Sequence, residues 1–139
     1  FITILIFFCI KQEIAGYLLY QPFFRGEIYH DGDTEKLEQA IATYRSQGGP
    51  SSDDQGVAKA NCLYTHELSI SPKFRGKGLT SPLTSYVEEV AKSTGFDWLT
   101  LVSLPTPHAF WKKCGYQTHS EIDYEGQAFY MEKRIARYA

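Results

Sequence analysis

The order of four segments in the second half of the chain constrains the fold most. Residues 61–71, NCLYTHELSIS, are rich in residues that favour strands, and residues 97–104, DWLTLVSL, predict a second strand. A glycine loop and an amphipathic helix ending near Gly95 lie between them. A helix that connects two strands in this way predicts that the strands are parallel neighbours. The apolar positions of the helix recur at helical spacing: Leu83, Tyr86, Val87, Val90 and Ala91.

Hairpins are predicted on both sides of this unit. Residues 1–10 predict a strand, residues 11–16 a turn, and residues 17–24 a second strand ended by Pro22 and Gly26. Residues 116–124 and 127–135 predict a closing hairpin around Glu125-Gly126.

Two further helices complete the prediction. One begins at Asp33 or Thr34 and ends near Gln47, and residues 108–115 form a shorter one that ends at Gly115. No repeat or linker divides the chain, so residues 1–139 are predicted to form one mixed α/β domain. The buried stripe of the first helix consists of Leu37, Ala40, Ile41 and Tyr44.

The overall composition limits the partners. A net charge of -2 and a pI near 6.1 provide no basic field for nucleic acid or an anionic membrane. The cysteines Cys9, Cys62 and Cys114 lack metal-site spacing, which predicts no metal and buried free thiols in the reducing cytoplasm. The ten apolar opening residues are about half of a membrane span, and the absent methionine suggests that the natural start is missing.

The glycine loop Arg75-Gly76-Lys77-Gly78 leads directly into a helix with Pro82 in its first turn. The first amides of a helix have no intrahelical partner, and with the helix dipole they favour a phosphate. The alternative is an ordinary β-to-α turn with surface cations. The same tripeptide at Phe24-Arg25-Gly26 lacks the second glycine and the helix, and it predicts a plain turn. Neither the Walker A motif nor the dinucleotide fingerprint fits the loop.

The segments LYTHELSISPKFRGKGL and FWKKCGY, with the helix and strand between them, resemble the GNAT superfamily of N-acetyltransferases. The family's coenzyme loop reads [Arg/Gln]-x-x-Gly-x-[Gly/Ala], and Arg75 and Gly78 match its first two positions, with Thr80 at the third. The similarity covers about Ile14 to Ile135. It implies a mostly antiparallel sheet with a central parallel acetyl-CoA-binding unit. The family's N-terminal helices have no counterpart in this sequence.

The resemblance also implies a coenzyme site. In the family, a strand equivalent to Leu68, Ser69 and Ile70 pairs with pantetheine, and one of its amides binds the carbonyl oxygen in the transition state. The loop residues would hold the diphosphate, and Trp111 would pack over the coenzyme channel. The implied loop residues are Arg75, Gly76, Lys77, Gly78, Leu79 and Thr80.

His66 is the first candidate for the catalytic base, because imidazole titrates near neutrality. Serotonin N-acetyltransferases, a branch of the family, carry a catalytic histidine at the equivalent position. Strand alternation would place His66 on one face with Tyr64 and Leu68, and Glu67 on the other face unless a β-bulge re-aims it. Glu67 is therefore the second candidate. The other histidines, His30, His108 and His119, are expected to be solvated.

The leaving thiolate lacks its usual acid, because Trp111 stands where many family members have a tyrosine. Tyr116 and Tyr130 are the candidate replacements. The leading hypothesis is an acetyl-CoA-dependent N-acetyltransferase that acts on a small amine or an exposed amino group by direct attack. The alternatives are a non-catalytic acyl-CoA-binding module and an interaction domain in which the loop is merely a turn.

Overall fold

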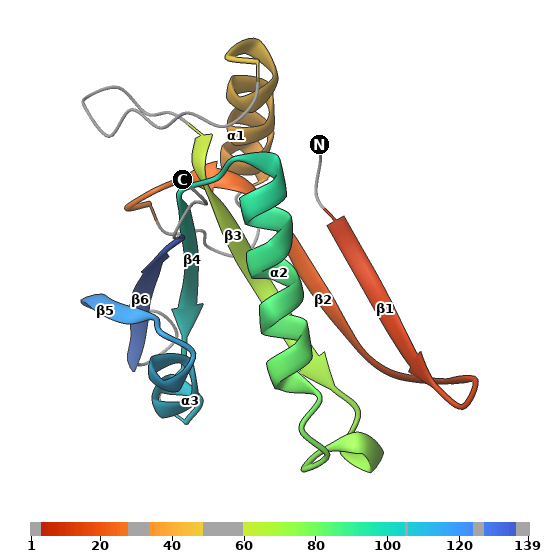
Figure 1. Ribbon diagram of the computed structural model, residues 1–139. Helices are drawn as coiled ribbons and strands as arrows, with labels where there is room; N and C mark the ends of the chain where they lie inside the picture. Colours follow the sequence, from red (N-terminus) through yellow and green to blue (C-terminus); the bar gives the residue numbers. More distant parts are fainter. Residues whose placement is uncertain (1–3, 28–33, 49–59, 105, 124–126, 136–139) are drawn as a thin grey trace.

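The computed structural model describes residues 4–27, 34–48, 60–104, 106–123 and 127–135. Six strands form one mixed sheet with the order β1-β2-β3-β4-β6-β5, and three α-helices pack against it (Figure 1). No described helix is long and apolar enough to cross a membrane. The elements are β1 (Ile4–Ile10), β2 (Glu13–Phe24), α1 (Thr34–Ser46), β3 (Ala60–Ile70), the 3₁₀ turn η1 (Pro72–Phe74), α2 (Thr80–Thr94), β4 (Trp98–Ser103), α3 (His108–Lys113), β5 (Gln117–Asp123) and β6 (Gln127–Arg134).

The central strands β3 and β4 are parallel, as predicted, and α2 connects them. All other neighbouring strands that the structure describes pair antiparallel. The sequence therefore predicted the class and the central unit of the sheet correctly. The acidic loop at 48–56 and the turn at 125–126 lie largely outside the described residues.

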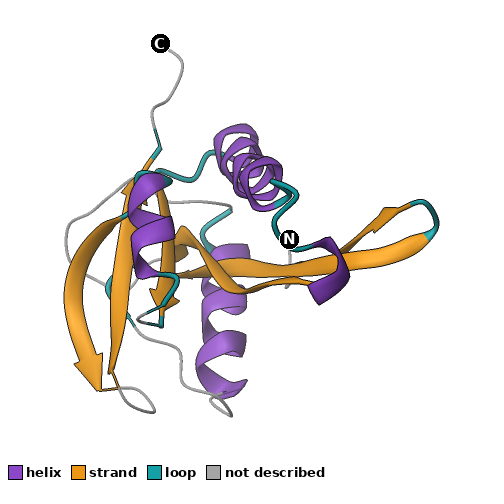
Figure 2. Cartoon of the chain, turned by 90° about the horizontal axis from the view of Figure 1, so that it is seen from below, coloured by secondary structure: helices purple, strands orange, loops and turns teal. Residues whose placement is uncertain are grey.

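The two longer helices cover opposite faces of the sheet (Figure 2). On the α2 face, Leu18 and Leu63 pack with Val87 and Phe96. On the α1 face, apolar side chains of β2 and β3 pack around Ala40. These two clusters define which way each strand residue points. The members of the second cluster are Phe23, Phe24, Ala40, Cys62 and Tyr64.

The predicted apolar stripe of α2 differs from the structure at one position. Val87 and Ala91 are buried, but Tyr86 is 47% exposed, at the margin of the stripe. Gly95 ends the helix with a φ of 97°, a left-handed conformation that suits glycine.

The first hairpin differs from its prediction in the length of the turn. The turn consists only of Lys11 and Gln12, and β2 already begins at Glu13. Gly16 therefore lies inside a strand, between Phe8 of β1 and Ile70 of β3. A Cβ atom at Gly16 would lie 2.1 Å from the carbonyl oxygen of Ser69, so β2 and β3 approach more closely here than any other residue would allow.

Pro22 does not end β2, which continues to Phe24. On the β3 side, Pro22 lies opposite Leu63. On the β1 side, the last described pair is Tyr20 with Ile4, two residues before Pro22. The missing amide of proline therefore removes no bond to β1.

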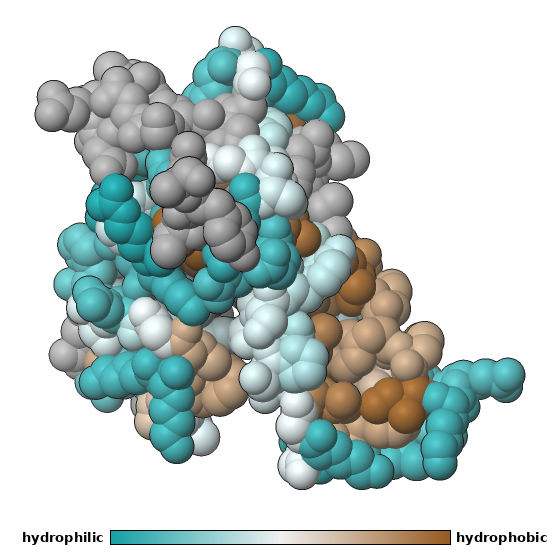
Figure 3. Space-filling view, viewed as in Figure 1, coloured by the Kyte–Doolittle hydropathy of each residue, from teal (hydrophilic) through white to brown (hydrophobic). Residues whose placement is uncertain are grey.

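Apolar residues also gather on the surface of the β1–β2 hairpin, beside α2 (Figure 3). On the face of the hairpin away from α2, the side chains of Leu5 and Phe7 are more than half exposed. Both faces of β1 are therefore apolar.

Candidate active site

The parallel strands part halfway along β3. Their pairing begins at Cys62 and Trp98 and ends at Thr65 and Leu101. Beyond that point β3 continues to Ile70, whereas β4 stays paired with β6 up to Ser103. Among the described strands, none pairs with residues 66–70 on the β4 side. This stretch therefore presents backbone donors and acceptors to an extended ligand.

A β-bulge lies where the strands part. The register between β2 and β3 passes from Thr65, opposite Tyr20, to Glu67, opposite Leu19, so His66 is the extra residue. An extra residue reverses the direction of all the side chains that follow it. The prediction that Tyr64 and Leu68 share a face is therefore wrong. Tyr64 packs in the α1-side cluster, and Leu68 packs against the α2-side cluster.

The bulge turns Glu67 toward the face that Tyr64 occupies. Its carboxylate is exposed and accepts a hydrogen bond of 2.6 Å from the hydroxyl of Tyr17. This bond to the carboxylate is the main cause that raises the pKa of the Tyr17 phenol. Glu67 is thus a fixed carboxylate two residues beyond the end of the β3–β4 pairing.

His66 lies at the point where the strands separate. Its ring is half-buried and meets the ring of Tyr64 edge-on, with the centroids 4.7 Å apart and an interplanar angle of 88°. The structure therefore places both candidate bases, His66 and Glu67, beside the parted strands.

The glycine loop closes the end of this opening. Gly76 and Gly78 adopt φ values of 77° and 72°, and a Cβ atom at either would meet nothing within 4 Å. Within the described chain, no hydrogen bond engages the amides of Gly76, Lys77 and Gly78. The first turn of α2 follows and carries no acidic side chain. Open backbone donors therefore lie directly before the positive end of a 15-residue helix.

A cavity of about 150 Å³ lies against this loop. Its lining includes six of the predicted coenzyme residues, together with Phe74. The Arg75 side chain is held by a 3.1 Å hydrogen bond from its Nε to the carbonyl of Ile70, another lining residue. The six predicted residues are Ile70, Arg75, Gly76, Gly78, Leu79 and Thr80.

The other predicted coenzyme residues lie outside this cavity. Lys77 points its ammonium toward the ring of Phe74, at 5.5 Å from the centroid. Ser69 lies opposite Tyr17 in the strand register. Trp111, on α3, packs edge-on against Phe110 and Tyr116 and contributes to the core on the α2 face.

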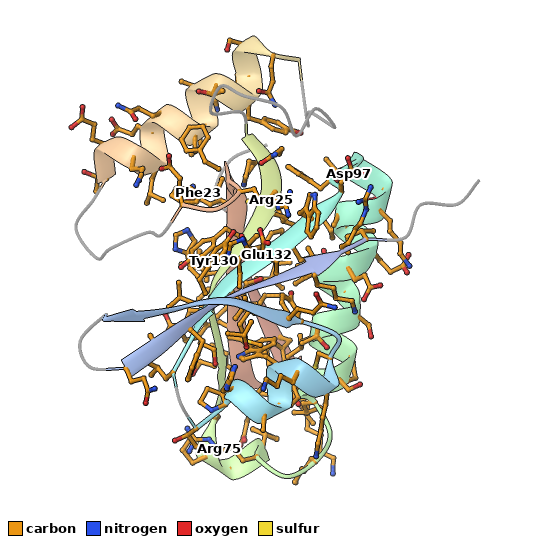
Figure 4. The ribbon with its side chains drawn as sticks, turned by 90° about the vertical axis from the view of Figure 1, so that its left-hand side faces the viewer. Phe23, Arg25, Arg75, Asp97, Tyr130 and Glu132 are labelled. Atoms are coloured by element: carbon orange, nitrogen blue, oxygen red, sulfur yellow. The ribbon has the colours of Figure 1, made fainter. Side chains whose placement is uncertain are left out.

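The two candidate tyrosine acids are buried. Burial raises the pKa of the phenols of Tyr116 and Tyr130 well above the usual range. The Tyr130 hydroxyl accepts a hydrogen bond of 2.7 Å from the Gly26 amide and donates one of 3.0 Å to Glu132. Figure 4 shows Tyr130 beside Glu132, far from Arg75 at the other end of the sheet. Tyr130 therefore forms its hydrogen bonds in a different part of the molecule.

The second FRG tripeptide is more than the plain turn that the sequence predicts. The Nε of Arg25 donates a 2.8 Å hydrogen bond to the buried Glu132 carboxylate. The same guanidinium stacks on the ring of Trp98, 3.4 Å from its centroid. Arg25 and Glu132 are separated by 107 residues, so no local pattern could reveal the pair. This network anchors the end of the sheet remote from the glycine loop.

The flanking histidines divide into two cases. His108 is not solvated as predicted, because its ring stacks on Phe129 at 3.8 Å and its Nε2 lies 2.7 Å from the Thr118 hydroxyl. His119 is largely exposed, with Nε2 at 3.9 Å from Glu132. His30 lies outside the described residues.

The three cysteines carry free thiols. Only Cys62 is buried as predicted, since Cys9 is exposed and Cys114 is half-buried. Burial raises the pKa of the Cys62 thiol to about 12, which keeps it protonated and unreactive.

Solved acetyltransferases resemble this chain in fold. An aminoglycoside 6'-N-acetyltransferase complexed with coenzyme A superposes with a TM-score of 0.64 and 15% identity, over 99% of this chain and 75% of that one. Tetrahymena GCN5 gives a TM-score of 0.61 and 12% identity, over 97% and 69%. An acetyltransferase from Bacillus cereus gives 0.59 and 17%, over 95% and 72%. The chain thus has the fold of these acetyltransferases.

The sequence places the chain in a family. The profile of the Acetyltransferase (GNAT) family matches residues 3–116, which include both β3 and the glycine loop. No curated protein matches the chain. The chain therefore belongs to the GNAT acetyltransferase family.

Proposed function

We propose that this protein transfers an acetyl group from acetyl-CoA to a primary amine, by direct attack of the amine on the thioester. The observation that carries the proposal is the continuity of β3, beyond the end of its pairing with β4 at Thr65, with the cavity at the glycine loop. An extended pantetheine would pair with that edge while the diphosphate meets the amides of Gly76 to Gly78. Membership of the GNAT family and the coenzyme A complex of a protein with the same fold support this arrangement.

The reaction requires a base at the parted strands. The ammonium of the substrate gives a proton to the base, the nitrogen forms a bond to the acetyl carbon, and the carbon–sulfur bond breaks. The thiolate takes one proton, so an ammonium and acetyl-CoA yield an amide, coenzyme A and one released proton. Glu67 meets solvent on the face opposite α2 and is the better placed base, and His66 is the alternative.

The transition state would be stabilised by the strand itself. An amide among Leu68, Ser69 and Ile70 would donate to the carbonyl oxygen as it gains negative charge, an effect of about 2.7–4 kcal/mol where such a donor is preorganised. Trp111 supplies no proton, because an indole only donates a hydrogen bond. A thiol with a pKa of about 8.5 leaves as a thiolate at neutral pH, so the reaction proceeds without a dedicated acid.

Two measurements test the proposal. Thiol release from acetyl-CoA should rise when amines are added, and it should fall about 100-fold or more in Glu67→Gln if Glu67 is the base. A comparable loss in His66→Gln with an active Glu67→Gln would assign the base to His66. Coenzyme A binding, followed by calorimetry, should be lost in Gly78→Glu, since a carboxylate would enter the diphosphate position. Retained binding in this variant would contradict the site.

The half-buried Trp111, which packs against the α2-side core, favours a second candidate, a coenzyme-binding module without turnover. This candidate predicts coenzyme A binding that Gly78→Glu abolishes, together with no thiol release across a broad panel of amines. Thiol release that depends on an amine would exclude it.

A further inference from the structure

The strand register places six side-chain positions in two rows beside the candidate base. One row consists of Leu5, Leu19 and Glu67, and the other of Phe7, Tyr17 and Ser69. Leu5 and Phe7 are on the face opposite α2, because the alternating residue Ile6 packs against the α2-side core. Leu19 lies on the same face, between Leu18 and Tyr20 of that core.

This surface combines an apolar wall with one fixed carboxylate. Leu5 is 51% and Phe7 56% exposed, and the rings of Phe7 and Tyr17 lie 6.3 Å apart at 59°. Neighbouring strands are about 4.8 Å apart, so the wall extends roughly 10 Å from Glu67 across β2 to β1. α1 packs on the same face in the cluster that contains Phe23 and Tyr64. Figure 2 shows this helix away from the turn of the β1–β2 hairpin.

Tyr17 connects the wall to the base. Its ring belongs to the wall, and its hydroxyl donates to Glu67 at 2.6 Å. One carboxylate oxygen is thereby engaged, which fixes the orientation of the group. The raised pKa of Tyr17 keeps the phenol protonated, so it remains a donor over the working pH range.

We propose that Tyr17 is a positioning residue that orients the Glu67 carboxylate, and that the acceptor is a primary amine carrying an apolar body that packs on Leu5, Phe7 and the Tyr17 ring. This inference rests on the proposed function and names the substrate class of the same site. The ammonium complements the charge of Glu67 at the border of the wall, and the exposed apolar side chains Leu5 and Phe7 select an amine with an apolar body over a hydrophilic one. The apolar body lies on the wall while the amino group reaches the parted strands.

The experiment compares 2-phenylethylamine with ethanolamine, an amine without an apolar body. Wild type should use 2-phenylethylamine with a kcat/KM at least tenfold higher. Phe7→Ala should raise the KM for 2-phenylethylamine about tenfold, and the KM for ethanolamine far less, since an aromatic contact and its buried area are lost. Ile14→Ala is the matched control, because Ile14 is 60% exposed on the same hairpin but lies beyond the last pair between β2 and β3.

Tyr17→Phe separates the positioning role from the wall. It keeps the ring and removes only the hydroxyl. The loss of a hydrogen bond to a charged group should lower kcat about 10- to 100-fold for both amines, with the KM for each amine and for acetyl-CoA nearly unchanged. A purely structural role of Tyr17 would change the thermal midpoint, and we expect this midpoint to stay at the wild-type value.

Direct binding distinguishes failure of this inference from failure of the proposed function. In the presence of coenzyme A, calorimetry should show 2-phenylethylamine binding that weakens about tenfold in Phe7→Ala and in Glu67→Gln. This pattern without any turnover would refute acetyl transfer and keep the amine site. Turnover with equal use of both amines, or an unchanged kcat in Tyr17→Phe, would overturn the inference and keep the proposed function. A wild-type dimer that Phe7→Ala dissociates, with unchanged amine kinetics, would also overturn it by assigning the wall to a second copy.

Discussion

Replacing Gly16 by alanine tests the close approach of β2 and β3 beside the site. The new Cβ atom would lie 2.1 Å from the Ser69 carbonyl oxygen and 2.5 Å from Cζ of Phe8. The Phe8 ring can turn away, because the contact involves the far end of a side chain. The carbonyl oxygen belongs to the backbone of β3 and can move only if the two strands separate by about 1 Å, a requirement that follows from ordinary packing distances.

The expected cost is at the upper end of the range for overpacking, about 3 kcal/mol. Domains have total stabilities of about 5–15 kcal/mol, so the change removes a substantial part of the stability. With a urea dependence of roughly 2 kcal/mol per molar, the midpoint of unfolding should fall by about 1.5 M.

Urea unfolding followed by circular dichroism measures this change. Gly76→Ala is the matched control, because a Cβ atom there meets nothing within 4 Å and the only cost is its φ of 77°. That cost is about 1 kcal/mol, which corresponds to roughly 0.5 M urea. If Gly16→Ala unfolds at the same urea concentration as Gly76→Ala or wild type, the strands are not packed as closely as described.

Two further predictions concern buried groups remote from the loop. Arg25→Ala and Glu132→Ala should show a coupling of about 2 kcal/mol in a double-mutant cycle, a value below that of a fully buried pair because Arg25 is 27% exposed; additive losses would contradict this coupling. Burial raises the pKa of the Cys62 thiol to about 12, so the unfolded chain releases this proton at a lower pH than the folded chain does. Ionisation of Cys62 should therefore lower the free energy of unfolding as the pH rises from about 9 toward 12. Cys62→Ala should flatten the alkaline decline in urea midpoint, and an unchanged slope would refute the assignment.

The parts of the site that the sequence could predict are local in the chain. The glycines, the helix that follows them and the strands on either side all lie within residues 61–104. Each is specified by residue type and periodicity over a short stretch, and the right-handed crossover then leaves one arrangement. The structure gathers six of the predicted loop and strand residues around one cavity for this reason.

The parts that could not be predicted depend on pairs distant in sequence. Tyr17 and Glu67 are 50 residues apart, and Arg25 and Glu132 are 107 apart. His108 was expected to be solvated, but it stacks on Phe129 because α3 returns over β6. The apolar content of a segment predicts burial, but it does not identify the neighbour.

The β-bulge at His66 shows most clearly why periodicity fails at this site. Alternation along β3 holds from Cys62 to Thr65, and it gives the wrong face for every residue after the bulge at His66. The sequence contains no glycine or proline there to indicate the irregularity. The extra residue coincides with the end of the β3–β4 pairing, where a bulged strand bends most easily because one edge is unpaired. The same irregularity therefore separates the parallel strands and turns Glu67 toward Tyr17. A variant that lacks His66 should therefore pair without the bulge, with Thr65 still opposite Tyr20 and Glu67 still opposite Leu19, so that Leu68 stays on the α2 face and Glu67 stays beside Tyr17.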